Sequence, residues 1–181
     1  MMQGRRDLDI RFETERLAVR PCAALPEEPA ASDRLEGDLR KILTPAVLAH
    51  LPGALQFEVE TDRALSWLEA RLAESAIALV YEAGTGGLLG VLILARAPGS
   101  DATEVHLGYL FGEFAWGRGY ATELLRGLVE HLRGRPGTKL WAGVDQANPA
   151  SARVLEKVGF TKVDGSAPPG TEFYVWDAGA A

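Results

Sequence analysis

The chain has 181 residues, of which 47% are hydrophobic and 24% are charged. This length and composition are typical of one globular domain and exclude a disordered or fibrous chain. The formal charge of -6 and the pI near 5.1 argue against a nucleic-acid partner, because such proteins carry clusters of Lys and Arg that replace counterions. A mildly acidic surface would attract cationic amines, although the same charge is common among soluble proteins.

Cys22 is the single cysteine, so an internal disulfide or a cysteine metal cluster cannot form. We expect a cytoplasmic setting and no bound metal. Residues 1–10 are charged and lack the apolar stretch of a signal peptide, and no later segment has the roughly 18 apolar residues of a membrane span. We therefore expect a single domain over residues 1–181, with 1–10 as a flexible leader and no membrane partner.

The first part of the chain predicts a strand followed by helices. Residues 12–20 alternate loosely between apolar and polar side chains, and Pro21 should end this strand. Apolar residues at helical spacing predict one or two short helices between residues 23 and 52, interrupted at Thr44-Pro45. A further amphipathic helix is predicted over residues 62–74.

The middle of the chain predicts three strands. Residues 76–82 and 88–96 are apolar runs separated by a glycine-rich connection, which predicts an antiparallel hairpin. A turn at Pro98-Gly99-Ser100-Asp101 leads into a further strand over residues 104–111.

The second half predicts helices alternating with strands. Apolar residues recur at steps of three and four over residues 118–132, which predicts an amphipathic helix. A strand over 139–144, a helix over 148–158 and closing strands near 160–163 and 171–176 follow. This order predicts an α/β (α+β) fold, with a sheet that is antiparallel in its first half and partly parallel in its second.

A glycine-rich segment, Trp116 to Glu123, lies between the strand ending near Phe111 and the helix over 118–132. Glycines let the backbone approach a bulky anion, and the first amides of a helix have no internal acceptor, so a pyrophosphate would fit here. A glycine turn without a ligand explains this segment equally well. The dinucleotide fingerprint fits poorly because Thr122 stands where its third glycine or alanine is needed, and the Gly-Lys-Ser/Thr of NTPase phosphate loops is absent.

A second motif begins at Asn148-Pro149-Ala150-Ser151. Asn148 is a natural N-cap, Pro149 suits the first helical position, and Gly159 would end the helix, so structure alone accounts for much of it. Asn148 and Ser151 also follow the strand beside the glycine turn, where polar groups could contact a cofactor. The sequence leaves both readings open.

Together these segments resemble the GNAT superfamily of N-acetyltransferases, specifically its branch of ribosomal-protein N-terminal acetyltransferases (RimJ/RimL type). The resemblance covers nearly the whole chain and rests on motifs in the expected order: Thr14-Glu15-Arg16-Leu17, Leu107-Gly108-Tyr109, Trp116-Gly117-Arg118-Gly119-Tyr120-Ala121-Thr122-Glu123, and Asn148-Pro149-Ala150-Ser151 through Lys157-Val158-Gly159-Phe160. It implies a mixed sheet of about six to seven strands, mostly antiparallel with a splayed parallel pair, and helices on both faces.

The resemblance also implies that acetyl-CoA is the acetyl donor and that its pantetheine lies between the strands 104–111 and 139–144. The residues that would bind it are Leu110, Phe111, Trp116, Gly117, Arg118, Gly119, Tyr120, Ala121, Thr122 and Asn148. The superfamily usually has Gln or Arg three residues before its first glycine, where this chain has Phe114.

Acetyl transfer to an amine needs a proton acceptor and a donor for the departing thiolate. Glu104 and His106, two residues apart on one strand face, are the candidate acceptors, directly or through water. Leu155 stands where many superfamily members have a tyrosine acid, so Ser151 is the candidate donor, as the resemblance to this branch implies.

We expect an N-acetyltransferase acting on a protein N-terminus or a small-molecule amine, as a monomer or homodimer. A non-catalytic acyl-CoA-binding module with the same fold is the alternative, and only the enzyme would release CoA when an amine is added. A nucleotide-binding domain would instead prefer ATP or NADH.

Overall fold

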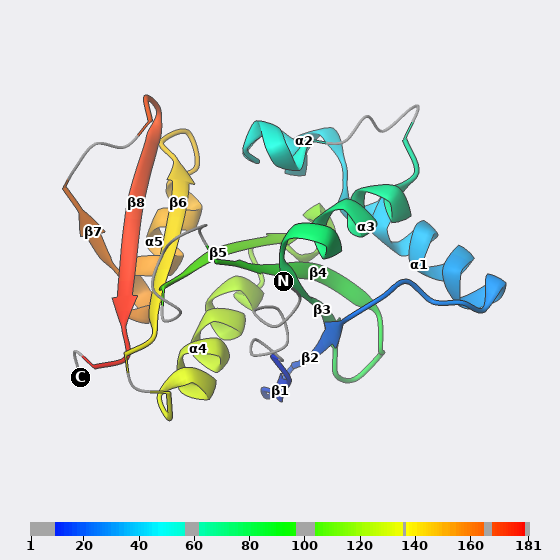
Figure 1. Ribbon diagram of the computed structural model, residues 1–181, viewed down its shortest axis with the longest axis horizontal. Coiled ribbons are helices and arrows are strands. Elements are labelled where there is room, and N and C mark those ends of the chain that lie inside the picture. Colours follow the sequence, from blue (N-terminus) through cyan, green and yellow to red (C-terminus); the bar gives the residue numbers. More distant parts are fainter. Residues whose placement is uncertain (1–9, 57–61, 97–103, 136, 165–167, 180–181) are drawn as a thin grey trace.

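The computed structural model describes residues 10–56, 62–96, 104–135, 137–164 and 168–179. Within these ranges eight strands form one sheet in the order β1-β2-β3-β4-β5-β6-β8-β7 (Figure 1). The strands are β1 Phe12–Glu13, β2 Leu17–Cys22, β3 Ala76–Glu82, β4 Leu88–Ala95, β5 Glu104–Phe111, β6 Lys139–Asp145, β7 Thr161–Val163 and β8 Thr171–Asp177. The α-helices are α1 Pro29–Ile42, α2 Pro45–Leu48, α3 Ala64–Glu74, α4 Tyr120–Leu132 and α5 Pro149–Val158.

The sheet is mixed, as the sequence predicted. Neighbouring strands run antiparallel except for β5 and β6, which are parallel. The strand number exceeds the predicted six to seven because the first predicted strand is two. No helix in the described ranges is both long and apolar enough to span a bilayer.

The expectation that Pro21 ends the first strand is wrong. Pro21 lies inside β2, opposite Ala78 of β3. Since β1 pairs only with Ala18 and Val19 of β2, β2 has an open edge at Pro21, where the missing N–H removes no ladder hydrogen bond.

The prediction that residues 1–10 form a flexible leader is wrong for Ile10. Ile10 is 2% exposed and packs in the main core, while residues 1–9 lie outside the described residues. The predicted turn at 98–101 also lies outside them. Trp67 of α3 is buried and donates from Nε1 to the carbonyl of Leu55 at 2.9 Å, which is a packing role.

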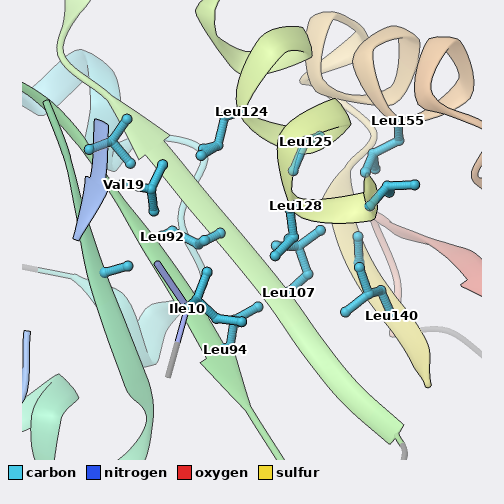
Figure 2. Packing of buried hydrophobic residues seen from close by; sticks show 14 of the residues in the cluster. Ile10, Val19, Leu92, Leu94, Leu107, Leu124, Leu125, Leu128, Leu140 and Leu155 are labelled. Atoms are coloured by element: carbon cyan, nitrogen blue, oxygen red, sulfur yellow. The ribbon is translucent and has the colours of Figure 1, made fainter. Parts of the chain in front are cut away.

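Two hydrophobic clusters cover the two faces of the sheet. One packs α4 and α5 against the sheet, and Figure 2 shows leucines of α4 meeting residues of β2, β4, β5 and β6. The other packs α1, α2 and α3 on the opposite side. Each buried leucine contributes roughly 1.5–3 kcal/mol, so the leucines Leu124, Leu125, Leu128 and Leu132 of α4 fix this helix, and with it the turn that precedes it.

The parallel strands β5 and β6 separate along their length. Their pairing covers only Glu104–Leu107 of β5 and Lys139–Ala142 of β6. Beyond these residues β5 pairs only with β4 and β6 only with β8, and Figure 1 shows the two strands diverging. A gap therefore opens between the carboxyl-terminal halves of β5 and β6, as the resemblance implied.

Side chains of β5 and β6 alternate between the two faces. Val105, Leu107 and Phe111 belong to the cluster under α4 and α5, whereas Leu110 belongs to the cluster under α1 to α3. We call these sides the α4 face and the α3 face. On β6, Leu140, Ala142 and Val144 lie on the α4 face, so the alternate residues of β6 lie on the α3 face.

Candidate functional site

The glycine-rich turn leads from β5 into α4. Gly117 and Gly119 have φ of 69° and 80°, a left-handed conformation that glycine adopts without steric cost. Gly119 is the N-cap of α4. A Cβ at Gly117 would meet no atom within 4 Å, so this glycine is required by its backbone conformation and not by crowding within the chain.

The turn presents unpartnered backbone donors. The first helical hydrogen bond of α4 runs from the amide of Glu123 to the carbonyl of Gly119 at 3.1 Å. Among the described residues, no protein acceptor is recorded for the amides from Gly117 to Thr122. Donors that converge at a helix N-terminus bind anions, because the helix dipole adds to their partial positive charge. The residues present therefore fit a pyrophosphate.

The motif that begins at Thr14 forms hydrogen bonds with both ends of this turn. The carboxylate of Glu123 accepts hydrogen bonds from Thr14 Oγ1 at 2.6 Å, from the Arg16 amide at 2.8 Å and from Arg16 Nε at 2.7 Å. Arg16 Nη1 also donates to the carbonyl of Arg118 at 3.0 Å. The burial of Glu123 by itself would raise its pKa, but the bonds from Thr14 and Arg16 outweigh it and lower the pKa. The segment between β1 and β2 thus ties both ends of the turn together.

Tyr120 fills the inner side of the turn. Its ring is 3% exposed and lies beneath the Arg16 and Arg118 guanidinium groups, 4.6 Å and 5.0 Å from its centroid. Its hydroxyl donates to Glu82 Oε1 at 2.6 Å, which raises the pKa of Tyr120 and lowers that of Glu82. Tyr120 therefore packs in the core beneath the turn.

Replacing Glu123 with Gln is expected to destabilise the fold by about 1–2 kcal/mol at pH 7, since charged hydrogen bonds are lost and Arg16 is partly screened by solvent. The pKa of Glu123 is lower in the folded state than in the unfolded state. Its contribution to the free energy of unfolding is therefore complete above the unfolded pKa of about 4.3 and is lost as the pH falls through the folded pKa. Urea unfolding at several pH values measures this. Glu130→Gln on the same helix is the control, because loss of its exposed pair with Arg133 should change stability by under about 0.5 kcal/mol. Equal effects of both variants at pH 7 would show that the bonds from Thr14 and Arg16 to Glu123 do not stabilise the fold.

Backbone groups of β5 line the gap on one side. The Gly112 amide donates to Leu89 of β4, and a Cβ at Gly90 of β4 would lie 2.3 Å from the Leu110 carbonyl oxygen, so the Leu110 carbonyl is directed at β4. Because ladder bonds alternate along a strand, the backbone groups of Tyr109 and Phe111 point the other way, into the gap. The Leu110 carbonyl therefore does not face the gap between β5 and β6, where the family resemblance had placed Leu110 as a residue that binds acetyl-CoA.

The Trp116 side chain forms a hydrogen bond with the last residue of β5. Its Nε1 donates to the Phe111 carbonyl at 2.8 Å, while the side chain is 48% exposed. This bond occupies one of the gap-facing acceptors and leaves the Phe111 amide and the Tyr109 backbone groups toward the gap. Trp116 thus ties the residue before Gly117 to the end of β5.

The late motif brings Ser151 to the gap. Asn148 caps α5 by accepting from the Ser151 amide at 3.1 Å, which confirms the N-cap reading. The Ser151 hydroxyl lies 2.7 Å from the hydroxyl of Tyr109. Burial raises the pKa of Tyr109, and the bond with Ser151 opposes this only in part. A protonated phenol and a serine hydroxyl therefore stand together on the α4 face, where the strands diverge.

Glu104 and His106 lie elsewhere. They belong to the paired part of β5, opposite Lys139 and Trp141 of β6, and project to the α3 face. His106 is exposed and Glu104 half-buried. The structure does not bring them together with Ser151, which approaches from the α4 face.

Another pair of polar side chains lies at the open end of the gap. His50, just after α2, places Nδ1 4.0 Å from Asp145 Oδ2, at the last residue of β6. Asp145 lies on the α3 face, on the same side as His106. Nothing in the sequence indicated this pair, because His50 and Asp145 are far apart and belong to no motif. Tyr109 was also missed as a site residue, although its motif had been recognised.

An open mixed sheet whose parallel strands splay beside a glycine-rich turn and a helix N-terminus is the architecture of the GNAT acetyltransferases. The family profile described as "Acetyltransferase (GNAT) domain" matches residues 33–161. The chain belongs to this family.

Solved structures agree with this fold over nearly the whole chain. A GNAT-family acetyltransferase from Bacillus anthracis is 17% identical, with a TM-score of 0.73 over 93% of this chain and 99% of that one. RimL, a ribosomal L7/L12 alpha-N-protein acetyltransferase in complex with coenzyme A, is 16% identical, with a TM-score of 0.67 over 93% and 97%. At these identities the likeness shows the fold alone. Among curated proteins, the uncharacterized protein YkkB of Bacillus subtilis (strain 168) is 29% identical over 118 residues, 64% of this chain and 68% of that protein.

Proposed function

We propose that this protein is an N-acetyltransferase that moves the acetyl group of acetyl-CoA to a primary amine in a ternary complex. The observation that carries the proposal is the gap between β5 and β6, which leads directly to the unpartnered amides of residues 117–122. A ligand with an extended arm and a pyrophosphate matches both parts at once. The RimL structure, whose fold is similar, holds coenzyme A, which supports this choice of donor.

In this proposal the pantetheine arm pairs with backbone groups of Tyr109 and Phe111, and the pyrophosphate accepts hydrogen bonds from the amides of Gly117 to Thr122. Arg118 beside the turn adds positive charge, and Asn148 fixes the start of α5 next to the arm. The contact first expected of Leu110 passes to Tyr109, because the Leu110 carbonyl faces β4.

Bound acetyl-CoA supplies a thioester carbonyl, which the neutral amine attacks from the α3 face. The new N–C bond forms as the C–S bond breaks, and the amine loses one proton while the sulfur gains one. Ser151 donates to the departing sulfur. Either hydroxyl can be the donor in the bond of 2.7 Å between Tyr109 and Ser151, and this step requires Tyr109 to be the donor. The proton acceptor is Glu104 or His106 acting through water, and the pair His50 and Asp145 is a second candidate on the same face.

The acceptor is an amine on a protein N-terminus or on a small molecule, and the setting is the cytoplasm, with the chain as a monomer or homodimer. The motifs that resemble the RimJ/RimL branch favour a protein N-terminus. A non-catalytic acyl-CoA-binding module remains the alternative.

Calorimetric titration with acetyl-CoA, CoA, ATP and NADH tests the donor, and we expect saturable binding of acetyl-CoA and CoA only. Release of free CoA, measured with a thiol reagent across a panel of peptides and amines, then separates an enzyme from a binding module. Preference for ATP or NADH would contradict the proposal, and tight CoA binding without CoA release from any amine would favour the binding module.

A further inference from the structure

The open parts of β5 and β6 place a single ionisable side chain on the α3 face. Beyond the paired part of the two strands, the residues that face this side are Gly108, Leu110, Gly143 and Asp145. The two glycines have no side chain that would block an amine on its way to the gap. Only Asp145 among the four can ionise. Glu104 and His106 lie on the paired part instead, where the strands have not yet separated.

Both oxygens of the Asp145 carboxylate have a defined direction. Oδ1 accepts a hydrogen bond from the Ala147 amide at 2.8 Å, which fixes the carboxylate at the end of β6. Oδ2 faces Nδ1 of His50 at 4.0 Å. An imidazole whose Nδ1 faces a carboxylate directs its Nε2 outward, where it can accept a proton, and the carboxylate stabilises the imidazolium that forms. Contacts of this kind are often longer than a hydrogen bond until the substrate is bound.

One short turn connects Asp145 with Ser151. The Asn148 amide donates to the Asp145 carbonyl at 2.8 Å, and Asn148 Oδ1 accepts from the Ser151 amide at 3.1 Å. The end of β6 and the start of α5 are therefore fixed relative to each other. Asp145 lies on the α3 face and Ser151 approaches from the α4 face. The reaction needs such an arrangement, because one proton leaves the entering amine and another reaches the departing sulfur.

We infer that His50 is a catalytic residue that takes the proton of the attacking amine, and that Asp145 is the residue that positions it. The inference rests on the proposed function, because it assigns the proton acceptor of that reaction. As the amine nitrogen bonds to the carbonyl carbon and the C–S bond breaks, one N–H proton passes to His50 Nε2, and the sulfur receives a proton from Ser151. His50 then releases its proton to solvent and the serine regains one from solvent, so both residues begin the next turnover unchanged.

His50→Ala tests the catalytic role through CoA release with an amine that the wild type acetylates. We expect the turnover number to fall about a hundredfold, while calorimetry gives an affinity for acetyl-CoA within about twofold of the wild type. Imidazole added to the buffer should raise the turnover of His50→Ala about tenfold, because the replaced side chain is 37% exposed and a free base can reach its position. Imidazole should leave the wild type unchanged. His50→Gln keeps a polar side chain but cannot take the proton, so its turnover should fall equally.

Asp145→Asn tests the positioning role. We expect the turnover number to fall about tenfold with the KM for the amine unchanged, and the double variant with His50→Ala to be no slower than His50→Ala alone, because Asp145 acts through His50. Asp177→Asn is the matched control. Asp177 also ends a strand, and its Oδ1 also accepts from the amide two residues further on at 2.8 Å, but it lies opposite Lys139 at the far end of β6. Its turnover should match the wild type.

The outcomes separate this inference from the proposed function. If His50→Ala keeps the wild-type turnover, or if imidazole fails to restore it, His50 is not the proton acceptor and the proposed acetyl transfer stands. If the losses of the two single variants multiply in the double variant, Asp145 does not act through His50. If the wild type releases no CoA with any amine, the proposed function and this inference both fail. The His50 side chain is exposed, so its variants should keep the wild-type thermal midpoint, which confirms that they are folded.

Discussion

Replacing Ser151 with alanine is expected to lower the turnover number about a hundredfold while leaving the affinity for acetyl-CoA within about twofold of the wild type. The hydroxyl contacts Tyr109 and, in the proposed reaction, donates to sulfur only as negative charge develops there. A group that acts at that moment affects turnover and not ground-state binding. Steady-state kinetics with an amine found in the CoA-release screen, together with calorimetry, measures the two quantities separately.

Two further variants sharpen this result. Tyr109→Phe keeps the partly buried ring and removes the hydroxyl, so turnover should fall about tenfold, less than for Ser151→Ala, because Ser151 itself remains. Ser66→Ala, on the exposed side of α3, should match the wild type. Unchanged turnover in Ser151→Ala would remove the serine from the mechanism, and a parallel loss of acetyl-CoA affinity would assign it to binding instead.

Replacing Gly90 with alanine is expected to destabilise the fold by about 3 kcal/mol. The new Cβ would lie 2.3 Å from the Leu110 carbonyl oxygen and 2.9 Å from Phe111 Cδ1. The first of these atoms belongs to the backbone, so the strands β4 and β5 must separate. Urea or thermal unfolding measures the loss. Acetyl-CoA affinity should also fall. A shift of Phe111 would displace both the backbone proposed to bind the pantetheine arm and the carbonyl that accepts from Trp116.

Gly108 provides the matched control on the neighbouring strand. A Cβ there would meet only Ile93 Cβ, at 3.8 Å, an ordinary contact. Gly108→Ala should therefore change the free energy of unfolding by less than about 1 kcal/mol. Equal destabilisation by the two substitutions would show that loss of glycine, and not the approach of β4 to β5, sets the cost.

Periodicity predicted the elements whose signal is local. The apolar spacing of α4 and the cap residues of α5 gave both helices nearly as they are found, because these patterns depend on neighbours within one or two turns. The prediction for Pro21 was wrong because it depends on a contact that is not local. Whether a proline ends a strand depends on which edge of that strand is open, and here the short partner β1 leaves the edge open at Pro21.

The candidate site divides in the same way. The glycine-rich turn could be placed from Gly117 and Gly119, since positive φ and the start of a helix are properties of the local chain. The face of β5 used by each side chain also follows from alternation, but what stands opposite it does not. Glu104 and His106 project away from Ser151, and His50 meets Asp145 across the α3 face, through contacts that no local pattern encodes.

The sequence by itself determined the order of strands and helices, the glycine turn with its unpartnered amides, and the family resemblance that linked four separated motifs. Only the tertiary structure decided which distant residues meet: Arg16 fastening Glu123 across the turn, Tyr109 meeting Ser151, and His50 meeting Asp145 at the open end of the gap. The physical reason is that hydrogen bonds and ion pairs act over a few ångströms in space. Residues far apart along the chain meet only after the sheet and the helices on its two faces have packed.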